Sequence, residues 1–139
     1  MLELRDDSMC FACGTRNPDG LHLEFAFEDG EVTTSIAFPK KYQGYRNVVH
    51  GGLISTVLDE AMVTLLNKMG LLAVTAELKV RFLRPARVGE TIRVTASLLE
   101  RRGRHSRVTA RAVGADGSEI AHGESRCVSF GAYDPEDGG

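Results

Sequence analysis

The feature that most constrains this chain is one helical segment, predicted over residues 51–69 and apolar around most of its circumference. One face, which would pack on the rest of the fold, repeats apolar residues at the i, i+3, i+4, i+7 spacing. Its members are Ile54, Val57, Leu58, Ala61, Leu65 and Met69. A second apolar flank consists of Leu53, Met62, Val63 and Leu66, and a polar stripe, expected to face solvent, consists of Thr56, Glu60, Thr64 and Asn67. Because such a helix is buried on more than one side and no second helix is predicted, we expect a second subunit to cover the flank.

The rest of the chain predicts antiparallel strands. Residues 21–27 and 32–38 alternate apolar and polar side chains around Asp29-Gly30, which is typical of a β-hairpin. Four more period-2 segments follow the helix, at about 74–82, 92–98, 108–112 and 119–130; in the first, the even-numbered residues from Val74 to Phe82 would be buried. One helix and about six strands predict an α+β fold. We expect a single domain over residues 1–139, with an irregular leader over 1–20 and a flexible tail over 132–139.

Composition narrows the class of protein. The chain has 139 residues and a net charge of −2, which disfavours a dedicated nucleic-acid binder. No apolar run approaches the roughly 18 residues that span a bilayer, and the acidic, polar amino end does not resemble a signal peptide. Three cysteines, an odd number, do not suggest a disulfide framework. We therefore expect a cytoplasmic protein that binds neither nucleic acid nor membrane.

The first candidate for chemistry is His50-Gly51-Gly52, directly before the helix. Free N–H groups and the positive end of the helix dipole meet there, and glycine lets a ligand approach the backbone closely. Such donors can polarise a carbonyl group. The tripeptide alone is weak support, and a tight loop into the helix is the alternative interpretation.

The second candidate is Asp59, on the apolar flank of the helix. A carboxylate there could act as a general base on water or as a nucleophile, although a surface acid beside Glu60 is equally compatible with the sequence. About 12 Å of helix rise separates Gly51 from Asp59, so both cannot easily contact one small electrophile from the same chain. Two antiparallel helices related by a two-fold axis would bring them together, and the sequence then predicts a dimer with two shared sites.

The third candidate is a group of arginines. Ten of the thirteen arginines lie between Arg81 and Arg126. The predicted group consists of Arg101, Arg102, Arg104 and Arg107 around Gly103, with Arg84 and Arg87 in a neighbouring turn. Arginine binds phosphate through bidentate hydrogen bonds, so the group would fit a nucleotide-bearing substrate. Solvated strand ends carry similar charges, and that interpretation stays open.

Together these segments resemble one family. The run GYRNVVHGGLISTVLDEAM at residues 44–62, followed by TAELKVRFLRPA at 75–86 and Gly89-Glu90, resembles the hotdog-fold acyl-CoA thioesterases, and most closely their PaaI-like, phenylacetate-pathway branch. The opening CFACG at 10–14 and NPDGL at 17–21 is similar to a leader in one branch of that superfamily. Over residues 10–130 the resemblance implies a hotdog fold (one long central helix wrapped by an antiparallel sheet), a homodimer or dimer of dimers, and hydrolysis of an acyl-CoA thioester.

The resemblance also implies roles for individual residues. Asp59 matches the catalytic carboxylate, Gly51 the backbone donor to the thioester carbonyl, and His50 the residue that shapes this loop. Thr75 falls where relatives place a serine or threonine that helps to hold the attacking water. Contacts to the substrate are expected from Gly52, Asn47, Met62, Arg84, Arg101, Arg102, Gly103 and Arg104. Many relatives have asparagine six positions before the histidine, where this chain has Gly44, and Asn47 is a candidate replacement.

Two other functions stay open. A non-catalytic acyl-CoA-binding or regulatory module is the main alternative, because a fold does not determine a function. Asp59 favours the enzyme, since binding alone does not require a carboxylate near an electrophilic carbonyl. A hydratase or dehydratase would use an aspartate and a histidine together, and the position of His50 before the helix disfavours it.

A metal site is the last candidate. Cys10 and Cys13 have the spacing of metal ligands, and Cys127 and His22 are the residues that could complete a site. One CxxC without a second pair is weak support. The sequence therefore predicts no metal and no cofactor.

Overall fold

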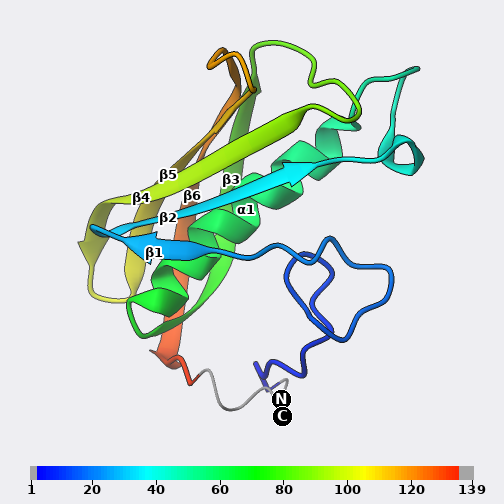
Figure 1. Ribbon diagram of the computed structural model, residues 1–139. Helices are drawn as coiled ribbons and strands as arrows, with labels where there is room; N and C mark the ends of the chain where they lie inside the picture. The colour runs from blue at the N-terminus through cyan, green and yellow to red at the C-terminus, as the bar shows by residue number, and fades with distance from the viewer. Residues whose placement is uncertain (1–2, 135–139) are drawn as a thin grey trace.

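The computed structural model describes residues 3–134, in which one long helix packs against a six-stranded antiparallel sheet (Figure 1). The elements are β1 (Ala26–Glu28), β2 (Glu31–Ala37), the short 3-10 helix η1 (Lys40–Tyr42), α1 (Gly51–Lys68), β3 (Leu71–Phe82), β4 (Thr91–Arg102), β5 (His105–Val113) and β6 (Glu119–Ala132). The strand order β1-β2-β4-β5-β6-β3 leaves β1 and β3 at the edges. The predicted α+β fold is confirmed.

No helix in the described part of the chain is both long enough and apolar enough to cross a membrane.

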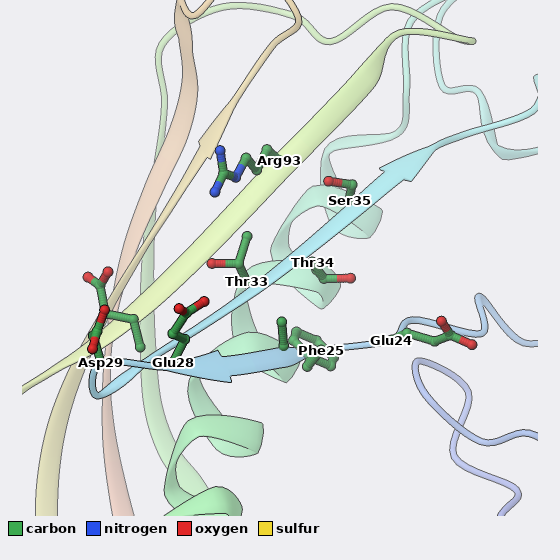
Figure 2. Close-up of a pocket in the computed structure, with 10 residues that line it drawn as sticks. Glu24, Phe25, Glu28, Asp29, Thr33, Thr34, Ser35 and Arg93 are labelled. Carbon is green, nitrogen blue, oxygen red and sulfur yellow. The ribbon is translucent and has the colours of Figure 1, made fainter.

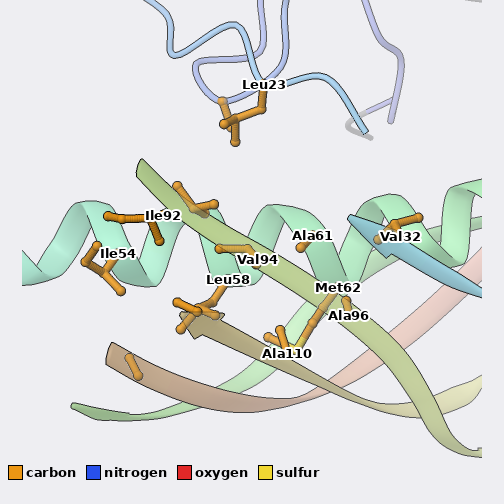
Figure 3. Packing of buried hydrophobic residues seen from close by; sticks show 14 of the residues in the cluster. Leu23, Val32, Ile54, Leu58, Ala61, Met62, Ile92, Val94, Ala96 and Ala110 are labelled. Atoms are coloured by element: carbon orange, nitrogen blue, oxygen red, sulfur yellow. The ribbon is translucent and has the colours of Figure 1, made fainter. Parts of the chain in front are cut away.

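The core lies between α1 and the concave face of the sheet (Figure 3). Leu58, Leu65 and Val57 of the predicted packing face are buried. Met62 and Leu66 are also completely buried, so the prediction that they belong to a flank left for a second subunit is wrong, whereas Leu53 and Val63 of that flank are half-buried. The sheet curves around the helix and reaches Met62 and Leu66, which period counting on a single element cannot show.

Residues 3–25 form a leader without helix or strand that folds back onto α1. The prediction of a strand over residues 21–27 is wrong for residues 21–25, because β1 consists of only three residues, Ala26–Glu28. Leu23 is instead buried and points from the leader toward the helix (Figure 3), and its N–H donates to the Ala12 carbonyl at 2.9 Å. The leader also covers part of the helix stripe that was expected to face solvent. In that stripe, Glu60, Thr64 and Asn67 are only half-exposed and line a cavity beneath the leader.

A β-bulge in β3 changes which side chains face the helix. The register with β6 pairs Thr75 with Cys127 and Glu77 with Arg126, so Ala76 is an extra residue. Because side chains alternate along a strand, one extra residue reverses the inward set. Ala73 and Thr75 face inward before the bulge, whereas Val74 is 41% exposed. The prediction of one buried even-numbered face is wrong: the bulge turns Val74 and Ala76 outward, and beyond it Leu78 and Phe82 are also exposed along the sheet edge.

The carboxyl end of the described chain is part of the sheet. Ala132 closes β6 opposite Leu71, and the Tyr133 N–H donates to the Gly70 carbonyl at 3.0 Å. The predicted tail is therefore wrong at its first two positions, and residues 135–139 lie outside the described residues.

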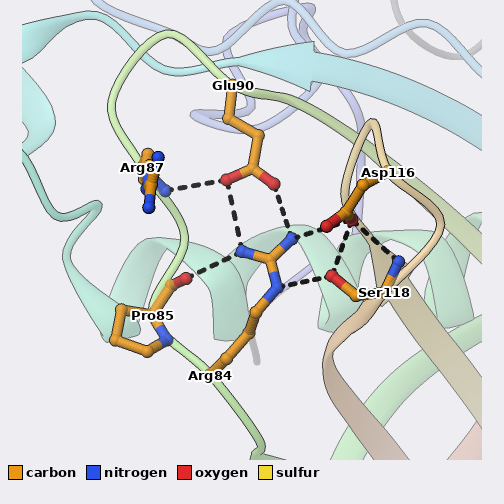
Figure 4. A network of polar contacts seen from close by, with 6 residues as sticks. All are labelled: Arg84, Pro85, Arg87, Glu90, Asp116 and Ser118. Atoms are coloured by element: carbon orange, nitrogen blue, oxygen red, sulfur yellow. Dashed lines mark hydrogen bonds and ion pairs between the residues drawn. The ribbon is translucent and has the colours of Figure 1, made fainter.

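An ion-pair network fixes the loop between β3 and β4 (Figure 4). Arg84 Nη2 lies 2.6 Å from Glu90 Oε1, and Arg84 Nε donates to Ser118 Oγ at 2.7 Å. Glu90 also accepts from the Arg87 N–H at 3.0 Å. The loop in turn holds the segment before α1, because the Val49 N–H donates to the Ala86 carbonyl. The network therefore supports the start of the helix.

The network makes a pH-dependent contribution to stability. The hydrogen bonds from Arg84 hold the pKa of Glu90 below its ordinary value. This stabilisation is full above the unfolded-state pKa of about 4.3 and is lost as the pH falls through the lower folded-state pKa. We expect Glu90→Gln to lower the free energy of unfolding by about 1–3 kcal/mol at pH 7 and to flatten its fall below about pH 4.3.

Urea unfolding at several pH values measures both effects. Glu77→Gln is the matched control, because Glu77 is 68% exposed and lies 4.0 Å from Arg126; its loss should stay below about 0.5 kcal/mol. Equal losses in the two variants would contradict the role of the network.

Candidate functional site

Asp59 and Thr75 form the centre of the candidate site. The Thr75 hydroxyl donates a hydrogen bond of 2.7 Å to Asp59 Oδ1, from β3 to the middle of α1. Both residues are half-buried. Asp59 is thus held against the sheet edge, and the alternative of a freely solvated surface acid is not what the structure shows.

The bulge at Ala76 places Thr75 in this position. Without the extra residue, a strand whose Val80 packs on the core would turn Thr75 away from the helix, because the side-chain period is two. Cys127, opposite Thr75 on β6, packs behind it with its Sγ 4.0 Å from Thr75 Oγ1. β-Bulges occur next to active sites, where they redirect a side chain. This bulge directs the Thr75 hydroxyl toward Asp59.

At the start of α1, one backbone N–H has no hydrogen-bond partner among the described residues. The helix begins at Gly51, and His50 is its N-cap, with Nδ1 accepting the Gly52 N–H at 2.9 Å. Gly52 is thereby occupied, whereas the Gly51 N–H makes no hydrogen bond within residues 3–134. A Cβ at Gly51 would lie 3.5 Å from the exposed ring of Phe82. The predicted donor is therefore free, next to an aromatic side chain and at the positive end of the helix dipole.

Gly44 and Asn47 belong to the loop that leads to His50. A Cβ at Gly44 would lie 3.5 Å from the His50 Cα, so this position lies against the histidine. Asn47 has a left-handed φ of 61° and accepts from Lys40 Nζ at 3.4 Å. Asn47 is exposed, and its backbone carbonyl accepts from the Val88 N–H. In this chain it is a loop-shaping residue.

The structure does not bring Gly51 and Asp59 together within one chain. They lie on the same straight helix, and eight residues correspond to about 12 Å. β3, which carries Thr75, lies at the sheet edge with Val74, Leu78 and Phe82 substantially exposed along it. Gly51 and Asp59 are thus separate within one chain, and the β3 edge beside Asp59 carries apolar side chains.

The arginines form two groups rather than one. Arg84 and Arg87 lie before β4, whereas Arg101, Arg102 and Arg104 lie at its far end, and a strand of twelve residues is about 36 Å long. The prediction of neighbouring turns is wrong, because the two turns lie at opposite ends of β4. Arg84 is engaged with Glu90. At the other turn, Arg104 lies over the Phe130 ring with its Cζ 5.4 Å from the centroid, and Gly103 has a left-handed φ of 57°.

Met62 is placed away from any open surface. Its side chain is completely buried and its Sδ accepts from Ser125 Oγ at 3.4 Å. Val63, one residue later, instead lines the cavity beneath the leader. Contact of Met62 with a substrate remains a prediction that needs a movement of the core.

A second cluster of reactive side chains lies where the leader meets α1. One ligand atom each from Cys10, Cys13 and Glu60 falls within 4.8 Å of the others. Burial raises the pKa of the Cys13 thiol, and the Glu60 carboxylate raises it further. Burial also raises the pKa of Glu60. The proposed partners Cys127 and His22 are elsewhere: Cys127 is buried beside Thr75, and His22 Nε2 contacts the Asn17 carbonyl.

The described part of the chain contains two hollows of note. The larger, about 920 Å³, lies between the leader, α1 and the start of β3, and is lined by Cys10, Glu60 and Val63 among others. The second, about 590 Å³, lies beside β1 and β2 and is lined mainly by acidic and hydroxyl side chains with Arg93 (Figure 2). Neither hollow is lined by Asp59 or Thr75, so both are separate from this pair.

The family model of the thioesterase superfamily matches residues 46–121, which include His50, Asp59 and Thr75. The chain belongs to the thioesterase superfamily. No curated protein gives a significant sequence match. Among solved structures, another thioesterase superfamily protein has a TM-score of 0.82 at 24% identity, covering 92% of this chain and 68% of its own. The PaaI protein of the E. coli phenylacetic acid degradation operon has a TM-score of 0.76 at 20% identity, covering 81% and 83%.

A third superfamily structure holds a ligand. It is a hypothetical thioesterase from Streptococcus pneumoniae with coenzyme A, at a TM-score of 0.76, 15% identity and coverage of 81% and 88%. The same protein was also solved with an aspartate, and separately with a threonine, replaced by alanine. At these identities the solved structures establish the hotdog fold of the chain.

The His50 cap generates a prediction about the helix start. His50→Ala removes the side-chain acceptor for the Gly52 N–H and should lower the free energy of unfolding by about 0.5–2 kcal/mol. His50→Asn, which supplies another good N-cap acceptor, should retain most of the stability. Urea unfolding measures both; equal losses would show that the ring contributes through packing rather than as a cap.

Proposed function

We propose that this protein is an acyl-CoA thioesterase that hydrolyses the thioester to a free acid and coenzyme A. The observation that carries the proposal is the hydrogen bond from Thr75 to Asp59 at a half-buried position beside an open sheet edge. A solvated surface carboxylate would not need such a partner. Membership of the thioesterase superfamily supports the reaction class.

Asp59 acts as a general base on water or as the attacking nucleophile. The Thr75 hydroxyl engages Oδ1, which leaves Oδ2 as the oxygen to face the substrate. Because the hydrogen bond holds the carboxylate in one rotamer, less orientation has to be gained in the transition state. The Gly51 N–H, at the positive end of α1, polarises the thioester carbonyl and stabilises the developing oxyanion.

The complete site needs two chains. Asp59 of one subunit and Gly51 of the other meet when two copies pack about a two-fold axis with their helices antiparallel. The β3 edge favours this arrangement, because it is long, unpaired within the described chain and carries apolar Val74 and Leu78 beside Thr75. We propose a homodimer that further assembles as a dimer of dimers, acting in the cytoplasm.

The coenzyme A phosphates are assigned to the turn between β4 and β5. Arg101 and Arg102 are exposed there and Arg104 is steadied by Phe130, which suits recognition of phosphate. A hotdog neighbour holds coenzyme A. In the same neighbour the aspartate and threonine replaced by alanine are separated by the same sixteen positions as Asp59 and Thr75, which supports these two residues as the working pair.

Turnover of acyl-CoA substrates tests the pair directly. With a panel of short, long and aromatic acyl-CoAs, Asp59→Asn should lower kcat by at least about 100-fold while coenzyme A binding persists. Thr75→Ala should lower it by about 10–100-fold, since a hydrogen bond to a charged group is lost, and Thr75→Ser should retain most activity. Free-thiol release measures the rates.

The same panel separates the alternatives. Binding without turnover across all substrates would indicate the acyl-CoA-binding module, and unchanged turnover in Asp59→Asn would contradict the catalytic assignment.

Mixed subunits test whether the site is shared. Gly51→Pro removes only the N–H, because proline is accepted at the first helical position and His50, at φ −58° and ψ 128°, already has the backbone that precedes proline. Gly51→Ala keeps the N–H and is the matched control. Inactive Gly51→Pro and inactive Asp59→Asn, unfolded and refolded together in equal amounts, should recover about a quarter of wild-type turnover through one intact site per heterodimer. No recovery would place both groups in one chain.

A further inference from the structure

We propose that Cys10, Cys13 and Glu60 bind a zinc ion that fastens the leader to α1. The proposal concerns the junction of these two segments, and it stands whether or not the chain hydrolyses thioesters.

The turn at residues 10–14 presents two sulfur atoms together. The Gly14 N–H donates to the Cys10 carbonyl at 2.8 Å, and the Cys13 N–H donates to Cys10 Sγ at 3.5 Å. Gly14 is required, because a Cβ there would lie 2.4 Å from the Cys10 nitrogen. The turn is therefore closed tightly, with its sulfurs near one another.

The third ligand comes from α1, fifty residues away. Glu60 Oε1 lies 3.8 Å from Cys10 Sγ, and the three ligand atoms all lie within 4.8 Å. A tetrahedral zinc, with Zn–S of about 2.3 Å and Zn–O of about 2.1 Å, separates a sulfur and an oxygen ligand by about 3.6 Å and two sulfurs by about 3.8 Å. The Cys10–Glu60 separation of 3.8 Å is close to the first of these values.

A bound cation would also pair the Glu60 carboxylate at this junction. Within residues 3–134, Glu60 forms no ion pair with lysine, arginine or histidine. It is half-buried beneath the leader, and a carboxylate removed from water is normally paired or coordinates a metal. Two thiolates with one carboxylate suit zinc, which accepts both sulfur and oxygen ligands.

The geometry leaves the fourth zinc ligand to water. The three side chains line the cavity of about 920 Å³ between the leader and α1, so solvent reaches the open side of the cluster. Three protein ligands with water in the fourth place is the coordination known from catalytic zinc sites, whereas purely structural sites have four protein ligands. The structural effect of the zinc here is to join a leader without helix or strand to the helix turn that follows Asp59.

Zinc binding to the reduced, metal-free full-length chain tests the proposal. Competition with a chromogenic chelator should give one zinc per chain, and cobalt in its place should give thiolate charge-transfer absorption. Cys10→Ser and Cys13→Ser should bind zinc more than about 100-fold more weakly, and Glu60→Gln more than about 10-fold, since even loss of an outer hydrogen-bond partner costs 10–100-fold. Cys127→Ala, which removes the remaining cysteine, should bind like wild type.

Circular dichroism establishes that each variant folds, and limited proteolysis should show a leader that zinc protects in wild type only. Absence of stoichiometric zinc in folded wild-type protein would overturn the proposal, as would equal weakening in Cys127→Ala. Wild-type affinity in Glu60→Gln would also overturn it, because the zinc would then not reach the helix.

Discussion

The fold depends on burying one helix, α1, which is apolar on too many sides to be exposed to solvent. The sheet covers most of α1 by curving around it, so that residues from two predicted flanks, such as Leu58 and Met62, are buried on the same core. The leader covers a further side and contributes Leu23. On the side toward β3 the helix carries a carboxylate, Asp59, which is half-buried and hydrogen-bonded to Thr75. The candidate site is thus a polar contact within the packing of the helix on the sheet.

The sequence predicted what local patterns determine. The helix ends within one residue of its predicted bounds, because the His50 cap and the left-handed Gly70, at φ 88°, are encoded locally. The Asp29-Gly30 hairpin is likewise found, with both residues at positive φ as a tight turn requires. Family resemblance added Asp59 and Thr75, which the fold brings to hydrogen-bonding distance.

What the sequence could not predict depends on contacts between distant segments. The bulge at Ala76 exists only relative to β6, so an even-numbered apolar pattern indicated the wrong face for half of β3. The leader was predicted to contain a strand because residues 21–27 alternate, yet its hydrogen bonds go to residues 11 and 12 instead of to a neighbouring strand. Glu60 was likewise assigned to a solvent stripe, because the sequence of the helix alone does not indicate that a cysteine pair fifty positions earlier packs against it.

Asp59 and Glu60 show how one helix turn serves two environments. Consecutive helical residues point about 100° apart, so Asp59 is directed to β3 and Thr75 while Glu60 is directed to the leader and its cysteines. Both are carboxylates beside little or no positive charge, and each is held by a neutral donor from another segment. The leader and β3 are thus held by adjacent residues of one helix turn, so the contact of the leader with α1 lies one position from the carboxylate of the candidate site.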